Sequence, residues 1–338
     1  MIEQKGFALV LVLWVLSLLT IMAGSFALSM RREAAIVTGS RSNAQAMAVA
    51  ESGLAVAELM LMYPDQRQRW RTDGSIYQID YATDKVRVRL LSETGKIDLN
   101  SADQTLLQGL MAYAPVDDKL QAKLVGAILD WRDEDDLIHI EGAEKNEYKD
   151  AGLSYQPRNK PFQSIEELQL VLGIDEQLFK WLENRVTVYS GQSTVDLTQA
   201  AKEVLLVLPG MDAKGMDPKS IDQYIAARRE NAINGLPAPP FGASAASQSG
   251  MSSAIENTPE TAVNDGAPQG VTTVIAEALL EDGATAIIRA LITKSDSPEL
   301  SPFQVLKWQR NSVGDGSLFT DEKDELLVRQ YAEPEFNN

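Results

Sequence analysis

The sequence predicts an α+β fold, in which a long N-terminal helix packs on a small antiparallel sheet and a large all-α insert interrupts that sheet. Three observations predict it. An uncharged apolar stretch opens the chain and continues into helix-forming sequence; period-2 alternation appears at two distant places; and residues 96–233, between those places, show helical spacing instead. With 338 residues, the chain is long enough to form two or more cores.

The N-terminal segment begins with a short leader, residues 1–6, which ends in Lys5 and Gly6. Residues 7–30 then contain no charge, Asn, Gln or Pro, and as a helix they would span about 36 Å, more than the ~30 Å core of a bilayer. A secretory signal peptide is the alternative, but its apolar core normally has only about 7–15 residues. We therefore expect a transmembrane helix over 7–30.

The helix is expected to continue over residues 31–63, because this segment consists of good helix formers and meets no proline before Pro64. One rod of about 84 Å would result. A narrow apolar stripe near the 3.6-residue period supports the continuation, and it consists of Ile36, Met47, Leu54 and Leu61.

Period-2 alternation predicts the strands of the sheet. The first group lies within 64–95, and its two strands are expected at 75–81 and 85–91. The second group lies within 271–330, and its strands are expected at 271–280, 284–293 and 303–309. Residues 234–270, rich in Ala, Ser, Pro and Gly, read as a flexible loop between the insert and the second group, and residues 331–338 as a disordered tail.

The insert contains two related segments, Ile97-Asp98-Leu99-Asn100 and Val195-Asp196-Leu197-Thr198. Asn100 or Thr198 is expected to cap the helix that follows, and glycine turns are expected at Gly109 and at Pro209-Gly210. A third unit has a capping-box pattern at Ser164, a turn at Gly173 and a second helix over 175–185. We interpret all three as helix-hairpin-helix-like units, with core residues Phe162, Leu168, Leu170, Val171, Phe179 and Trp181.

Residues 130–150 carry the densest chemical signal, a run of carboxylates that begins Asp130-Trp131-Arg132-Asp133-Glu134-Asp135-Asp136. Carboxylates folded close together repel one another, so a bound cation would stabilise them. Without cysteine, and with His139 as the single possible nitrogen donor, the residues suit a hard ion such as calcium. The spacing does not match an EF-hand, and a solvated acidic loop is the alternative.

Lys5-Gly6-Phe7 followed by a long apolar helix resembles the leader of type IV pilins and type II secretion pseudopilins. The resemblance implies that a prepilin peptidase cuts after Gly6 and methylates Phe7. Most of that family has glutamate as the fifth mature residue, where this chain has Leu11. Because a buried carboxylate needs a partner such as the amine of a preceding subunit, Leu11 suggests a subunit with no predecessor, at the filament tip.

The absent glutamate is typical of the K-type minor pseudopilins. The acidic run, followed by Gly142-Ala143-Glu144 and Tyr148, also resembles the signature of their helical insert. Members of that family bind calcium in the insert. The resemblance therefore implies a structural calcium site whose candidate ligands are Asp130, Asp133, Asp135, Asp136, Glu141 and Glu144.

The resemblance implies a noncatalytic tip subunit, anchored once in the bacterial inner membrane with its body in the periplasm. Its implied partners are the I-type and J-type minor pseudopilins, the major pseudopilin and the prepilin peptidase. A membrane-anchored DNA receptor using the hairpins is the alternative, although a net charge of −17 disfavours nucleic acid. An enzyme is not expected, because no hydrolase, zinc-protease or phosphate-loop motif is present.

Overall fold

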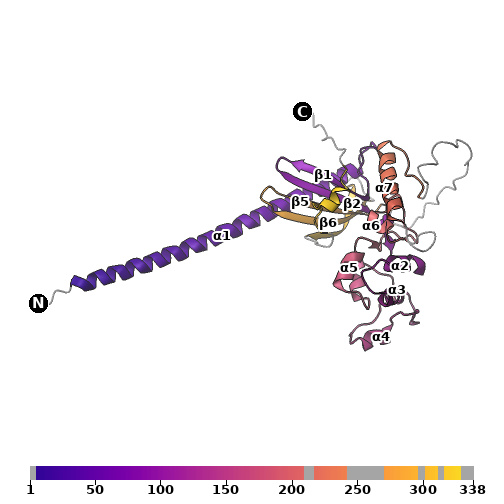
Figure 1. Ribbon diagram of the computed structural model, residues 1–338, viewed down its shortest axis with the longest axis horizontal. Helices are drawn as coiled ribbons and strands as arrows, with labels where there is room; N and C mark the ends of the chain where they lie inside the picture. The colour runs from indigo at the N-terminus through magenta and orange to yellow at the C-terminus, as the bar shows by residue number, and fades with distance from the viewer. Residues whose placement is uncertain (1–4, 209–216, 242–269, 296–300, 311–315, 329–338) are drawn as a thin grey trace, which may run out of the picture.

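The computed structural model describes residues 5–208, 217–241, 270–295, 301–310 and 316–328. One very long helix, α1 (Lys5–Leu61), leads into a five-stranded sheet, and a helical insert lies beside that sheet (Figure 1). The predicted α+β fold is confirmed. The strands of the sheet are β1 (Asp73–Tyr81), β2 (Asp84–Ser92), β5 (Thr272–Leu279), β6 (Thr285–Lys294) and β7 (Phe303–Arg310).

Helix α1 has two different halves. Its N-terminal half extends away from the rest of the molecule, and the side chains from Leu9 to Met30 are exposed (Figure 1). By length and composition, it is the one helix in the described part of the chain that could cross a membrane. Its C-terminal half packs on the sheet and ends just before Pro64, whose ring cannot continue a helix.

The face of α1 that meets the sheet consists mostly of alanine. Ala46, Ala50 and Ala57 are fully buried, and Leu54 lies between them. Small side chains allow the helix backbone to approach the sheet closely. The predicted stripe is right for Leu54, while Met47 and Leu61 are partly buried against the same core. It is wrong for Ile36, which is 71% exposed because the helix has not yet reached the sheet at that residue.

The sheet is antiparallel throughout, in the order β1-β2-β5-β6-β7. Each predicted strand is confirmed to within two residues at either end. Strand β2 pairs directly with β5, and Ser92 is opposite Thr272. The insert therefore leaves and rejoins the sheet at neighbouring positions. Helix α1 covers one face, and Ile76, Leu91 and Ile275 on the other face pack with Ala201 of the insert.

The insert has its own core, which includes Leu107, Ile128, Tyr148 and Leu182. A short parallel pairing of β3 (Ile97–Asp98) with β4 (Val186–Thr187) joins the start of the insert to the segment before α6, and two-residue strands leave no period-2 signal. Its helices are α2 (Gln104–Met111), α3 (Asp118–Arg132), α4 (Lys145–Asp150), α5 (Glu176–Leu182), α6 (Lys202–Leu205) and α7 (Pro218–Ile233). The 3-10 turns are η1 (Glu93–Gly95) and η2 (Ile165–Leu170), and a last short helix is α8 (Asp321–Asp324).

The predicted caps of the first two units are wrong. The N-cap of helix α2 is Asp103, whose carboxylate accepts from Leu106 N at 2.7 Å. The Asn100 side chain instead exchanges hydrogen bonds with the backbone of Phe162. Thr198 donates its hydroxyl to Asp196, and α6 begins after Ala201. Asp98 and Asp196, rather than Asn100 and Thr198, therefore hold the two turns through hydrogen bonds.

The expected glycine turns have mixed outcomes. Gly109 lies inside α2, so the turn predicted there is wrong. Pro209-Gly210 lies outside the described residues. In the third unit, the segment after Ser164 is the 3-10 turn η2, and the Ser164 side chain makes no capping hydrogen bond to it. Gly173 does adopt φ +93°, and Asp175 caps α5. The hairpin interpretation as a whole is not confirmed.

The predicted core residues, loop and tail have different outcomes. Five of the six expected core residues are buried or packed against the core, whereas Leu170 is 45% exposed. Of the predicted loop 234–270, residues 242–269 lie outside the described residues, and Phe241 packs edge-on against Tyr224. The predicted tail, residues 331–338, also lies outside them.

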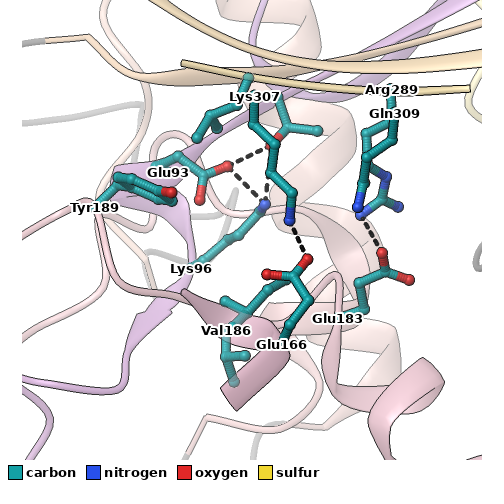
Figure 2. A pocket seen from close by; sticks show the side chains of 12 residues that line it. Glu93, Lys96, Glu166, Glu183, Val186, Tyr189, Arg289, Lys307 and Gln309 are labelled. Carbon is teal, nitrogen blue, oxygen red and sulfur yellow. Dashed lines mark hydrogen bonds and ion pairs between the residues drawn. The ribbon is translucent and has the colours of Figure 1, made fainter. Parts of the chain in front are cut away.

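Ion pairs join the insert to the sheet. Arg289 on β6 pairs with Glu183 at 3.0 Å, Lys307 on β7 pairs with Glu166, and Lys96 pairs with Glu93 at 2.6 Å. Figure 2 shows these three pairs side by side around a cavity of about 40 Å³. On β2, Arg89 pairs with Glu203 of α6 at 2.7 Å. The insert is therefore held to the sheet by charged contacts.

Candidate metal centre

The acidic run begins in the last turn of α3, where Asp130 is fully buried. Its Oδ1 accepts from the backbone N–H of His139 at 3.0 Å and lies 2.5 Å from Nδ1 of the same residue. Its Oδ2 accepts from the backbone N–H of Ala143 at 2.6 Å. One buried carboxylate thus holds both sides of the loop that follows α3.

The next two residues secure the same turn from outside. Trp131 lies in the insert core, with its ring 6.1 Å from that of Phe162, and its indole N–H donates to Glu167 at 3.3 Å. Arg132 donates to the carbonyl oxygens of Leu99 and Ala102. The turn is therefore attached to the segment that enters the insert, which fixes where Asp133 points.

Two glycines permit this close packing. A Cβ at Gly142 would lie 2.0 Å from Asp130 Oδ2, and a Cβ at Gly126 of α3 would lie 2.6 Å from the Gly142 Cα. Only glycine fits at either position. Sequence reasoning noted Gly142 as part of a signature and missed Gly126 and the role of Arg132. A glycine inside an otherwise regular helix was the available signal.

Ligand atoms of Asp130, Asp133 and His139 lie within 4.8 Å of one another. Two carboxylate oxygens beside them, Asp133 Oδ1 and Glu144 Oε1, are buried and have no hydrogen-bond partner among the described residues. A buried acceptor without a donor is costly, so these atoms fit a site for a cation.

The charge balance at Glu144 points the same way. Burial raises the pKa of Glu144 to about 7, and repulsion from Asp130, Asp133 and the two following aspartates adds to that increase. Burial likewise raises the pKa of Asp133. The carboxylate oxygens suit a hard divalent ion such as calcium, whereas the imidazole nitrogen of His139 is not a ligand that calcium prefers.

The structure separates the six predicted ligands into two groups. Asp130, Asp133 and Glu144 lie inward, while Asp135, Asp136 and Glu141 are exposed on the loop. Asp135 accepts from Leu137 N at 2.8 Å, and Asp136 accepts from the Asn159 amide at 3.0 Å. Glu141 is in the left-handed region, with φ +60°. His139 joins the inner group, because its imidazole contacts Asp130.

The predicted processing residues lie far from this centre. Gly6 and Phe7 fall in the first turns of α1, at the end remote from the sheet (Figure 1).

A long helix with a free apolar half, whose other half packs on an antiparallel sheet that carries a helical insert, is a pilin-like fold. Residues 86–191 match the family model described as "Type II secretion system (T2SS), protein K". This match confirms the resemblance of this part of the chain to the K-type family.

Two curated relatives carry the description "Type II secretion system protein K". The protein from Aeromonas hydrophila is 26% identical over 247 residues, which is 64% of this chain and 73% of that protein. The protein from Klebsiella pneumoniae is 27% identical over 202 residues, 53% of this chain and 61% of that protein. A solved chain from the GspK-GspI-GspJ complex of enterotoxigenic Escherichia coli matches with a TM-score of 0.42 and 17% identity, covering 83% of this chain and 98% of that one.

Proposed function

We propose that this chain is a minor pseudopilin at the tip of a type II secretion pseudopilus, where it initiates or caps the filament for protein export across the outer membrane. The observation that carries the proposal is α1. Its first half has an exposed apolar surface long enough to cross a membrane, and its second half packs on the sheet. Such a helix can anchor the subunit in lipid and later pack against the helices of other subunits.

The position at the tip is supported by Leu11. A leucine there has no charge to pair with the terminal amine of a preceding subunit, and its side chain is 53% exposed on the free half of α1. A subunit that needs no such pair can stand first in the filament. The insert, at the other end of the molecule, would then crown it (Figure 1).

The proposed partners are the I-type and J-type minor pseudopilins, the major pseudopilin beneath them, and the prepilin peptidase. The proposed location is the inner membrane, crossed once by residues 7–30, with the sheet and insert in the periplasm. The role is noncatalytic, and nucleic acid is not a proposed partner. Co-purification from detergent with coexpressed I-type and J-type subunits tests the assembly, and a folded chain that never co-purifies with them contradicts it.

Processing after Gly6 is tested by the mass of the membrane-extracted protein. We expect loss of residues 1–6 and an added methyl group on Phe7. Substituting the leader glycine, Gly6→Val, should leave the full mass, because a branched side chain would replace the small residue at the cut. An intact leader on the natural sequence, or a cut beyond residue 20, contradicts the pilin-type assignment.

We also propose that the inner acidic group holds a structural calcium ion, with Asp133 and Glu144 supplying the unpartnered oxygens. The ion would neutralise carboxylates that otherwise repel one another. Calcium at 100 times its Kd should stabilise the fold by about 2.7 kcal/mol, seen as a higher Tm. The double variant D133N/E144Q should lose this increase, and Glu134→Gln, on the exposed loop, should keep it. A Tm that does not respond to calcium or to chelator removes the ion from the proposal.

A further inference from the structure

A cleft of about 410 Å³ lies where α1 ends, at the opposite end of that helix from its apolar span. Its lining includes Leu61, Arg69, Trp70, Arg71, Gln199 and Leu236. In a chain with a net charge of −17, the lining gathers three arginines and one aspartate. The local sign of the charge is therefore opposite to that of the whole molecule.

Two of these arginines are already used by the fold. Arg228 donates to the carbonyls of Leu197 and Ala200 and pairs with Asp73 at 3.3 Å. Arg71 also pairs with Asp73 at 3.3 Å. Burial alone would raise the pKa of Asp73, but the two guanidinium groups outweigh it and hold that pKa below its usual range. The single acid of the cleft is thus neutralised from within.

The third arginine of the lining is available. Arg69 uses its Nε to donate to Tyr63 O at 3.0 Å, and its terminal guanidinium nitrogens have no partner in the described part of the chain. Arg67 is outside the lining but lies beside Gly235, the residue before Leu236, and its guanidinium also lacks a partner among the described residues. Asp65 holds this turn, accepting from Arg67 N at its side chain and from Arg69 N at its carbonyl.

The other part of the cleft is apolar and fixed. Trp70 is 6% exposed and stacks on Tyr77, with ring centroids 4.3 Å apart. Leu236, in contrast, is 56% exposed. Gln199 adds a polar group, since its Oε1 accepts from Thr72 at 2.7 Å and its amide nitrogen has no acceptor among the described residues. A cleft of this size with an apolar wall and a few directed donors is typical of a binding site.

We propose that this cleft binds an acidic peptide segment of a partner protein. A Glu or Asp carboxylate of the segment would meet the guanidinium groups of Arg69 and Arg67, whose paired N–H donors match a carboxylate. An apolar side chain next to it would cover Leu61 and Leu236. Selectivity for acidic over neutral segments follows from the two unpaired cations.

Other anions fit this position less well. About 46 Å of helix separates Met30 from Leu61, so the cleft lies far beyond the headgroups of a bilayer that holds the apolar span. A long polyanion such as nucleic acid would be repelled by a chain whose net charge is −17. The proposal does not depend on the filament-tip role.

A peptide pull-down tests the proposal on the full-length chain in detergent. The probe is a pooled hexapeptide library with two fixed Glu residues, compared with the same library carrying Gln. We expect at least tenfold enrichment of the acidic pool, at least tenfold weaker binding by the double variant R67A/R69A, and no change with Arg310→Ala, an exposed arginine on β7. Equal capture of the two pools, or equal loss with Arg310→Ala, overturns it.

Two further measurements separate the sources of anion. Inorganic phosphate and phosphatidylglycerol vesicles are added as competitors at matched ionic strength. Weak competition by both is expected. If vesicles bind through Arg67 and Arg69 while the peptide pool does not, the peptide assignment is wrong. The Tm of each variant checks whether the fold is retained. An unchanged Tm is expected, because neither Arg67 nor Arg69 pairs with an acid in the described residues.

Discussion

Asp130 determines the course of the loop after α3, because its two oxygens accept from His139 and Ala143 on opposite sides of that loop. Removing a charge that accepts several buried hydrogen bonds leaves donors unsatisfied. The acidic character of this residue is therefore needed for the shape of the site, apart from any ion.

In chelator, Asp130→Asn should destabilise the chain by about 2–3 kcal/mol, since its amide nitrogen must face a backbone N–H that now lacks an acceptor. Asp135→Asn is the matched control, because Asp135 is exposed and accepts a single bond from Leu137 N. Its effect should stay within about 0.5 kcal/mol. Urea unfolding measures both, and equal losses would contradict the assigned role of Asp130.

At this scale, the sequence predicted which residue types gather but not which atoms meet. The acidic run and its likeness to a known signature gave six candidate ligands, and Asp130, Asp133 and Glu144 are the three of these that lie inward. Nothing in the run separated Asp133 from Asp135, because both are short carboxylates near the end of a helix. Arg132 and Gly126 act through contacts with distant segments, and such contacts have no local pattern.

At the scale of elements, the small side chains on the buried face of α1 determine how closely this helix approaches the sheet. The buried face is mostly alanine. Gly53 also lies against the sheet, and a Cβ added there would come 2.8 Å from Val86 Cγ1. Valine is stiff and cannot move its methyl group aside easily. The glycine therefore sets the distance between helix and sheet.

Replacing Gly53 by alanine should destabilise the chain by about 1–2 kcal/mol, against the ordinary gain from removing a helical glycine. Gly39→Ala supplies the comparison, because Gly39 has no atom within 4 Å of its added Cβ and should gain up to about 1 kcal/mol. Thermal unfolding should therefore show a lower Tm for Gly53→Ala and a higher Tm for Gly39→Ala. A gain at both positions would mean that α1 can move off the sheet.

The strands and the long helix could be predicted because each has a period that spans many residues. Helix starts in the insert could not, since Asp98, Asn100 and Asp103 are all good caps within one turn of chain. The structure selects Asp103 for α2 and leaves Asn100 to hold Phe162. Tertiary contacts decided among residues that are locally equivalent.

On the scale of the whole molecule, charged pairs attach the insert to the sheet, and their strength depends on burial and pH. Burial would raise the pKa of Glu203, but Arg89, which is 1% exposed, outweighs it and lowers that pKa from 4.5 to about 2. A depressed pKa contributes stability above about pH 4.5, and that contribution is lost as the pH falls toward 2.

Glu203→Gln should therefore cost stability at pH 7, up to about 3 kcal/mol, and progressively less as the pH falls from about 4.5 toward 2. The exposed Glu322 supplies the control Glu322→Gln, for which little difference is expected at any pH. Urea titrations at several pH values measure the difference. A cost that does not change with pH would show that the pair matters through packing rather than charge.

Arg289→Met should cost about 3–5 kcal/mol, because it leaves Glu183 buried at the joint without its guanidinium partner. The double variant R289M/E183L should recover much of this loss, since both charges are then gone. Limited proteolysis of the joint and urea unfolding check the two variants. Full additivity of the single losses would mean that the pair is not coupled.

The pairing of Ser92 with Thr272 has a further consequence, for the order of folding. Closing a chain loop from 92 to 272 before anything inside it is ordered carries a large entropic cost, and pairings between distant strands form slowly. If β3 and β4 meet first, the stretch between them is already closed, and a shorter loop remains to be closed when Ser92 meets Thr272. The insert should then act as a template for the sheet, so that a newly made polypeptide pairs β2 with β5 last.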